Sequence, residues 1–290
     1  LEDFVENFAH RLEDIYRGKR SWTFFRRRAG LPAHAAADEE LETVALRNLS
    51  RLTHIDDPER NAFYRQILSS ARPPVLAQHS LTQQRLLTML AWGLGSGKSG
   101  RDDLDEFFKD FWTLETVKDE LSQLFGALDR RATTLTEVSE PADEPLNVHA
   151  RYSREEVVAA LGYGSGVKPK GPREGVLPVP EANSDVFFVT LYKAERDYSP
   201  TTMYRDYAIN RELFHWESQS GQATHQDTVQ RYINHRERGT NILLFVRERN
   251  EGELGPLPFT FLGPVDYVSH EGEKPVRFTW RLRRPMPAEL

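Results

Sequence analysis

The spacing of apolar residues changes near residue 140, and this change constrains the fold more than any other feature of the chain. Before it, apolar residues recur every three or four positions, as they do on one face of an α-helix. After it, short runs rich in β-branched and aromatic residues are separated by Gly and Pro, which is typical of strands. The sequence therefore predicts an α+β protein, with an N-terminal helical bundle followed by a small curled β-sheet or barrel.

Three parts follow from this pattern. We expect a bundle of about six helices over residues 1–132, a linker rich in Thr, Glu and Pro over 133–150, and a β-rich domain over 151–290. Two capping boxes, Ser80 with Gln83 and Ser153 with Glu156, predict helix starts. Because residues 151–290 hold enough apolar residues for a core, we expect them to fold independently.

Six strands are expected in the second half, with one helix between them. The strands are predicted at 186–192, 204–209, 213–217, 241–249, 259–268 and 276–283, and the helix is predicted to start at Asp227. In the last strand, Phe278, Trp280 and Leu282 alternate with polar residues, so this strand should bury one face.

Composition excludes several classes of protein. The chain has 290 residues and no cysteine, which rules out disulfides, cysteine-based zinc sites and thiol nucleophiles. Its 38 basic and 44 acidic residues give a net charge of −6, and residues 151–290 hold 19 of each. Any nucleic-acid binding must therefore come from local patches. With no long apolar run and no signal peptide, we expect a cytoplasmic protein that does not contact a membrane.

Several motifs resemble functional sites but are better explained otherwise. The segment Gly93–Ser99, GLGSGKS, has the wrong glycine spacing for a phosphate-binding loop and follows a helix, so it predicts a helix end. His215, His225 and His235 lack metal-ligand spacing, and no acyl-transfer motif is present. We therefore expect no catalytic residue, no metal and no cofactor in this chain.

The segment 198–216, YSPTTMYRDYAINRELFHW, is dense in aromatic and hydroxyl residues. Small hydroxyls in a loop can hold phosphate oxygens, and aromatic rings beside such a loop suit base stacking. The alternative for most of these rings is a place in the core. Three groups of arginines, on the 227–239 helix and on two strands, suggest a DNA-facing surface; the alternative for any one group is a solvated face.

The stretch from Tyr152 to Pro287 resembles one family over several long segments. These include SREEVVAALGYGS, VFFVTLYKAERDYSPTTMYRDYAI, LFHWESQS, QRYINHRERG, ILLFVRE and TFLGPVDYVSHEGEKPVRFTWRL. They are similar to a C-terminal domain of unknown function found in SauUSI-like type IV restriction enzymes. There, a phospholipase-D-like nuclease and an ATP-dependent motor precede a helical connector and this domain, which resembles SRA and PUA domains. Residues 1–132 match the connector more loosely, best at SWTFFRRRAGL.

The resemblance implies a bacterial defence function, with this chain as the DNA-recognition fragment of a longer protein; its start at Leu1 fits a fragment. No nuclease or motor motif is present, so the fragment should not be an enzyme. Its partners would be double-stranded DNA with modified cytosine and the parent's motor and nuclease domains. The alternative is a coupling module of a helicase-like protein that binds protein or unmodified duplex.

By this resemblance, a modified cytosine would be flipped into a pocket of the curled sheet. The expected base-binding residues are Tyr198, Tyr204, Tyr207, His215, Trp216 and Asn234. The expected phosphate-binding residues are Ser199, Thr201, Thr202, Arg231, Arg236, Arg238, Arg247, Arg281 and Arg283.

Overall fold

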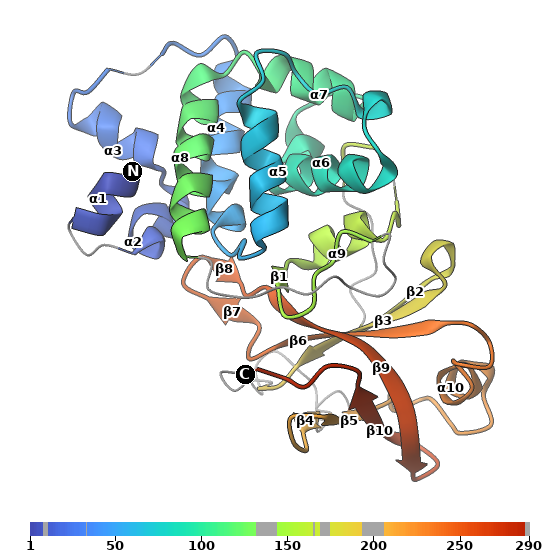
Figure 1. Ribbon diagram of the computed structural model, residues 1–290. Helices are drawn as coiled ribbons and strands as arrows, with labels where there is room; N and C mark the ends of the chain where they lie inside the picture. The colour runs from blue at the N-terminus through green and yellow to red at the C-terminus, as the bar shows by residue number, and fades with distance from the viewer. Residues whose placement is uncertain are drawn as a thin grey trace.

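The structure is a computed structural model that describes residues 1–7, 11–32, 34–131, 144–164, 166–168, 175–192 and 206–287. Helices form the N-terminal part, and a curled sheet forms most of the C-terminal part below them (Figure 1). Within the described residues, the protein is α+β, as the sequence predicted, and its main sheet is mixed. No described helix is long and apolar enough to cross a membrane.

The N-terminal part contains eight α-helices among its described residues, more than the six expected. They are α1 (Glu2–Asn7), α2 (Leu12–Tyr16), α3 (Trp22–Arg28), α4 (Glu39–Asn48), α5 (Pro58–Leu68), α6 (Leu81–Leu94), α7 (Leu104–Phe111) and α8 (Glu115–Arg131). Short 3₁₀ turns lie between them, including η1 (Arg17–Lys19), η2 (Leu49–Leu52), η3 (Leu76–Gln78) and η4 (Ser96–Lys98). Side-chain oxygens of Ser21, Asp38, Asp57, Ser80 and Asp103 cap helix starts.

The glycine-rich segment after α6 is a helix end, as expected. Gly95 closes α6 in the left-handed conformation, with φ of 94°. A Cβ at this position would lie 2.2 Å from Nδ2 of Asn48, so the close approach of α4 also requires glycine. The Ser96 hydroxyl then donates to the carbonyl of Val167 at 2.6 Å, which ties the turn to the C-terminal half.

The described residues of the C-terminal part form ten strands and two α-helices. The strands are β1 (Arg151–Tyr152), β2 (Val176–Val179), β3 (Ser184–Thr190), β4 (Tyr207–Ala208), β5 (Leu213–Glu217), β6 (Asn241–Arg247), β7 (Glu251–Gly252), β8 (Gly255–Pro256), β9 (Phe259–Glu271) and β10 (Arg277–Leu282). The helices are α9 (Arg154–Ala160) and α10 (Asp227–Ile233), and the 3₁₀ turn η5 (Pro180–Ala182) precedes β3.

The main sheet has the order β2-β3-β6-β9-β10-β5-β4, with β1 paired to β9. Only β3 and β6 run parallel; the other described pairs of this sheet are antiparallel. Among the described strands, β2 and β4 end the sheet without pairing to each other, so it is open and not a closed barrel. Strands β7 and β8 form a separate hairpin that reaches the helices (Figure 1).

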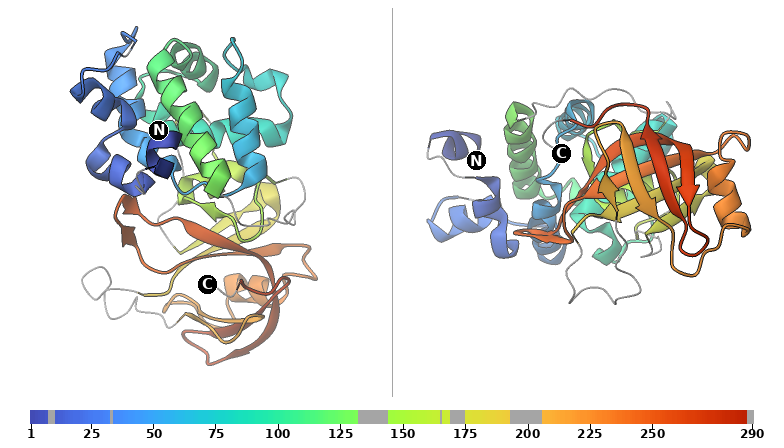
Figure 2. Two further views of the ribbon diagram at one scale, coloured as in Figure 1. Left: turned by 60° about the vertical axis from the view of Figure 1, so that its left-hand side comes forward. Right: turned by 90° about the horizontal axis from the view of Figure 1, so that it is seen from below.

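The sheet has apolar residues on both faces. One face packs against α9 and α6, where Phe245 and Phe261 stack with ring centroids 4.4 Å apart. The other face curls around α10, which lies at the end of the molecule away from the helical part (Figure 2). Phe187 of β3 stacks on Trp216 of β5 at 4.2 Å across this inner side. The interior of the curl is therefore filled with aromatic side chains.

The two parts of the chain share an apolar cluster. Met89 and Trp92 of α6 are buried in the cluster that contains Val157 and Val158 of α9. The described end of the predicted linker, residues 144–150, is also packed, with Leu146 among its buried residues. The predicted division at 132 and 150 stays a prediction, because residues 132–143 lie outside the described chain.

A buried polar network crosses the same junction. Arg60 of α5 is 1% exposed and lies 3.3 Å from the Glu156 carboxylate of α9. Its guanidinium also stacks on the Tyr152 ring, 4.7 Å from the centroid. Tyr152 donates its hydroxyl hydrogen to Asp57 at 3.2 Å, and the Asn147 amide donates to the same carboxylate at 3.0 Å. These contacts fix the helices on the β-rich part.

Candidate nucleic-acid interface

Five of the expected site residues cannot be placed. Tyr198, Ser199, Thr201, Thr202 and Tyr204 lie outside the described residues. Their roles as stacking or phosphate-binding groups stay predictions.

Trp216 is a core residue, which corrects its expected role in stacking a base. It is 5% exposed and packs against Phe187, Tyr232 and Phe278 on the inner side of the sheet. The physical reason is the strand period: Phe214 and Trp216 share one face of β5, and that face is the buried one. The interior pocket expected for a flipped base is, at this place, occupied by the protein's own rings.

Tyr207 and His215 lie together on the opposite, outward face of the sheet. The strand register pairs Tyr207 of β4 with His215 of β5. Their rings stack with centroids 4.6 Å apart and an interplanar angle of 13°. Tyr207 is 50% exposed, so one face of the stacked pair is open to solvent. Two of the expected base-binding residues are therefore brought together by the edge of the sheet.

Arg281 extends this surface along β10. Thr279 pairs with His215, and Arg281 follows it on the same outward face, because Phe278, Trp280 and Leu282 point inward. Arg281 is exposed and has no hydrogen-bond or ion-pair partner within the described chain. We call the surface formed by Tyr207, His215, Thr279 and Arg281 the outer platform.

Three of the other expected phosphate-binding arginines pair with acidic side chains of the protein itself. Arg231 forms a two-pronged pair with Asp185, with both N–O distances 2.8 Å. Arg236 and Arg283 share the Asp266 carboxylate at 2.6 and 3.3 Å. The sequence could not reveal these pairs, because each acid lies at least 17 residues from its arginine.

The pKa of Asp266 reflects its two partners. Burial opposes ionisation of this carboxyl, but hydrogen bonds from Arg236 and Arg283 outweigh it and hold the pKa below its usual value. The single carboxylate therefore compensates one of the two positive charges within the fold. The pairing of Arg236 and Arg283 with Asp266 is a structural role, and it makes the basic surface smaller than the sequence suggested.

The remaining candidates are Arg247, Arg238 and Asn234. Arg247 lies over the Phe259 ring at 4.3 Å and donates to the Thr190 hydroxyl at 3.0 Å. Asn234 ends α10, where its amide donates to the Gln230 carbonyl at 3.0 Å. Arg238 is exposed just beyond α10. Within the described chain, no three His, Asp or Glu side chains form a group that could hold a metal ion.

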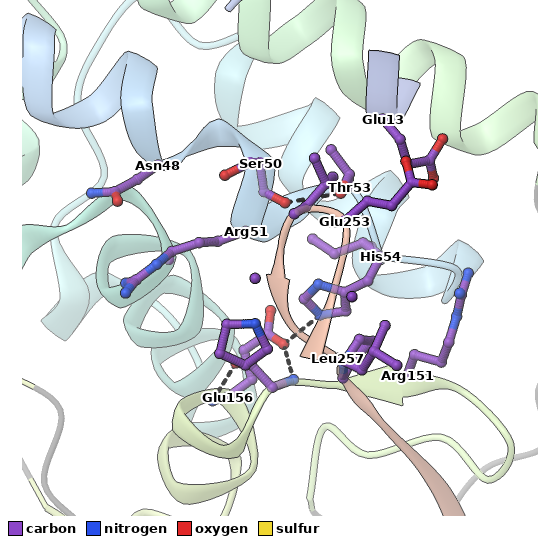
Figure 3. A pocket seen from close by; sticks show the side chains of 18 of the residues that line it. Glu13, Asn48, Ser50, Arg51, Thr53, His54, Arg151, Glu156, Glu253 and Leu257 are labelled. Atoms are coloured by element: carbon purple, nitrogen blue, oxygen red, sulfur yellow. Dashed lines mark hydrogen bonds and ion pairs between the residues drawn. The ribbon is translucent and has the colours of Figure 1, made fainter. Parts of the chain in front are cut away.

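A second surface, which the sequence did not indicate, is a pocket of about 780 Å³ between the helices and the β-rich part. Figure 3 shows its walls: Asn48, Ser50 and Arg51 on the helical side, with Glu156 and the β7–β8 hairpin opposite. His54 lies between them and contacts Glu156 at 2.7 Å. Because the lining residues come from distant segments, no local motif marks the pocket.

Glu156 is the buried charge of this pocket. Burial opposes its ionisation, but the charges of His54 and Arg60 and the hydrogen bonds that it accepts lower its pKa to about 2. The sequence identified Glu156 only as the last residue of a capping box, and it does accept the Ser153 backbone N–H at 2.7 Å. Its pairing with two residues of the helical part was not foreseen.

Comparison with known proteins gives one family. Residues 146–290, half of the chain, match the family model described as "Domain of unknown function (DUF3427)". No curated protein matches. One similar solved structure is titled "Crystal structure of Arabidopsis thaliana SUVH6 in complex with SAM, form 2", with 14% identity and a TM-score of 0.30.

That structural similarity spans 86% of this chain but 41% of the other, so this chain spans less than half the length of that protein. A TM-score of 0.30 does not establish a shared fold. The family match confirms the coarser part of the expected resemblance, that the C-terminal half is a catalogued domain of unknown function. The chain belongs to the DUF3427 family.

Proposed function

We propose that this chain binds DNA through the outer platform and recognises modified cytosine there. The observation that carries the proposal is the exposed stack of Tyr207 on His215 beside Arg281, which has no partner among the described residues. Open aromatic faces next to a guanidinium are what proteins use to stack bases and hold the strand that carries them.

The filled interior changes the expected mechanism. Extruding a base from the duplex costs a few kcal/mol, because stacking and pairing are lost, and contacts in the binding site must offset this cost. Phe187, Trp216 and Trp280 occupy the inner side of the curl, so the base is received on the outer face. Stacking on the platform contributes about 1–3 kcal/mol per base. Arg281 adds a charge that attracts the adjacent phosphate.

The wider setting is also a proposal. The segments similar to SauUSI-like enzymes support a place at the C-terminal end of a modification-dependent restriction enzyme in the bacterial cytoplasm. Its motor and nuclease domains would then be partners in the same parent chain. This chain would contribute recognition without catalysis or a cofactor, because its sequence has no nuclease or ATPase motif.

The test is the affinity of the full chain for a duplex with one 5-methylcytosine. Tyr207→Ala and His215→Ala should each weaken binding by about 1–3 kcal/mol, the value of one stacked base. The matched control is Tyr192→Ala, because Tyr192 is 70% exposed at the end of β3 and lies outside the platform. Unchanged affinity in both platform variants would refute the placement of the site.

A second candidate function, a coupling module, is favoured by the junction between the two parts. The apolar cluster with Met89 and Trp92, together with the Arg60–Glu156 pair, makes a tight mechanical connection. A coupling module would transmit conformational changes of the motor through this junction, and it would bind protein or unmodified duplex. Equal affinity for modified and unmodified duplex would favour this alternative.

A further inference from the structure

The pocket between the helices and the β-rich part has the size and position of a ligand site. Its volume of about 780 Å³ is within the range of small-molecule pockets, roughly 300–1,000 Å³. Such pockets occur preferentially where two structural units meet. It is separate from the outer platform, whose residues do not line it.

Most acidic residues of the lining are already paired. Asp56 accepts from Arg151 at 2.8 Å, and Glu253 of the β7–β8 hairpin pairs with Arg11 at 3.2 Å and with Arg17. Glu156 contacts His54 and Arg60, and Glu248 lies 3.3 Å from Arg249. These carboxylates are thus compensated by neighbouring cations and contribute little net negative potential to the pocket.

The unpaired charges have a positive excess. Four lining cations have no side-chain partner among the described residues: Lys19, Arg47, Arg51 and Arg131. Two lining carboxylates are likewise unpaired, Glu13 and Glu155. The lining groups that have no partner among the described residues therefore carry a net charge of 4 − 2 = +2.

Arg47 and Arg51 concentrate this excess on one wall. They lie four residues apart, at the end of α4 and in η2, where like charges on adjacent turns repel each other. The Ser50 hydroxyl lies between them in sequence and has no described partner. Figure 3 shows Arg51 and Ser50 together on the helical side of the pocket. Two guanidinium groups and a hydroxyl are suited to oxyanions with several acceptor oxygens.

We propose that this pocket binds a phosphate-bearing ligand through Arg47, Arg51 and Ser50. The ligand is either a nucleotide or a phosphate group of a nucleic-acid strand, and the phosphate chemistry is common to both. The walls belong to both parts of the chain, so an occupied pocket stabilises their packing. This site goes beyond the proposed function and does not depend on it.

The experiment titrates the full chain with pyrophosphate, a nucleoside triphosphate and a short single-stranded oligonucleotide by isothermal calorimetry. The double variant Arg47→Gln/Arg51→Gln should weaken binding by about tenfold or more, because two charge-assisted contacts are lost. Arg28→Gln is the matched control: it is exposed, unpartnered in the described chain and outside the pocket. Both substitution sites are exposed, so the fold should be retained.

The three probes identify the source of the phosphate. Binding of pyrophosphate and the nucleotide supports a small ligand. Binding of the oligonucleotide alone supports a strand, provided that Arg47→Gln/Arg51→Gln weakens it. Pyrophosphate has no base to stack, so Tyr207→Ala should leave the affinity for this probe unchanged, which separates this site from the outer platform. Wild-type affinity in the double variant, or no binding of any probe by the wild type, would overturn the proposal.

Discussion

At the scale of single residues, strand alternation determines which ring can meet a ligand. His215 and Trp216 are neighbours in β5, yet one faces outward under Tyr207 and the other is buried against Phe187. The sequence placed the candidate base-binding rings mainly in segment 198–216. It could not decide which face was covered, because that depends on β3, which comes from a distant part of the chain.

Trp216→Ala should therefore lower the free energy of unfolding, because Trp216 is part of the core and not of the DNA-binding surface. Removing a buried indole leaves a cavity between Phe187, Tyr232 and Phe278, and such changes cost about 3–5 kcal/mol. Urea denaturation measures the free energy of unfolding. The control is Tyr207→Ala, which should change it little because Tyr207 is half exposed. Equal losses in both variants would contradict the assignment of the two faces.

His235 is a buried histidine whose two ring nitrogens are both used. Its Nε2 accepts the Tyr267 backbone N–H at 3.2 Å, which requires that nitrogen to be unprotonated. Its Nδ1 then carries the hydrogen and donates to the Thr240 carbonyl at 3.1 Å. Burial lowers the pKa of His235, and this effect exceeds the opposing influence of the Thr240 carbonyl and Asp266.

A lowered pKa makes the unfolded chain bind protons more readily than the fold near pH 6.5. The stability that His235 contributes is present above pH 6.5 and is lost as the pH falls below it, toward the lower pKa of the folded state. Unfolding measured from pH 7.5 to pH 5 should show this loss, and His235→Gln should reduce it. His225→Gln, at an exposed site, should keep the wild-type slope; if it does not, His235 is not the group responsible.

At the scale of elements, local signals predicted positions well. The two capping boxes form as expected, at the starts of α6 and α9. The strand 213–217 is found with its predicted limits. The limits predicted for the strands 241–249 and 276–283 each differ by at most two residues from those observed. The helix α10 begins at Asp227, as predicted, with Gln226 as its N-cap. Helix capping and the alternation of apolar and polar residues in a strand depend on residues only a few positions apart. Both can therefore be recognised in the sequence.

Pairing between elements could not be predicted. Nothing local indicates that β3 lies parallel to β6, or that Arg231 and Arg236 pair with acids 46 and 30 residues away. The candidate site was therefore only partly foreseen: Tyr207, His215 and Arg281 share one face, while four expected phosphate-binding arginines hold the fold together.

The contact of α9 with α5 gives a prediction at this scale. Glu156→Ala leaves the buried Arg60 without its carboxylate, and breaking a buried pair in this way costs about 3–5 kcal/mol. Glu155→Ala is the neighbouring control, since Glu155 is exposed. Chemical denaturation compares the two; a loss as large in Glu155→Ala as in Glu156→Ala would show that the pair is not responsible.

The same carboxylate gives a pH dependence with a defined sign. The pKa of Glu156 falls from 4.5 to about 2 on folding. Its contribution to stability is therefore present above about pH 4.5 and is lost as the pH falls toward 2. Glu156→Gln should remove this part of the acid sensitivity.

For the whole molecule, the shared apolar cluster bears on independent folding. A fragment of residues 144–290 would expose the surface that Met89 and Trp92 cover, and it would lose the Arg60 contact. We predict that it melts at a lower temperature than the full chain, as followed by circular dichroism. A fragment with the full chain's melting temperature would show that the junction contributes no stability.

The affinity of the wild-type chain for three duplexes that differ at one cytosine tests the central claim most directly. The duplexes carry cytosine, 5-methylcytosine or 5-hydroxymethylcytosine, and the ionic strength is held constant because phosphate contacts depend on it. A methyl group that packs against the platform rings contributes about 1–3 kcal/mol, so we predict a preference of roughly 10- to 200-fold for a modified duplex. Equal affinity for all three, or no binding, would contradict the claim.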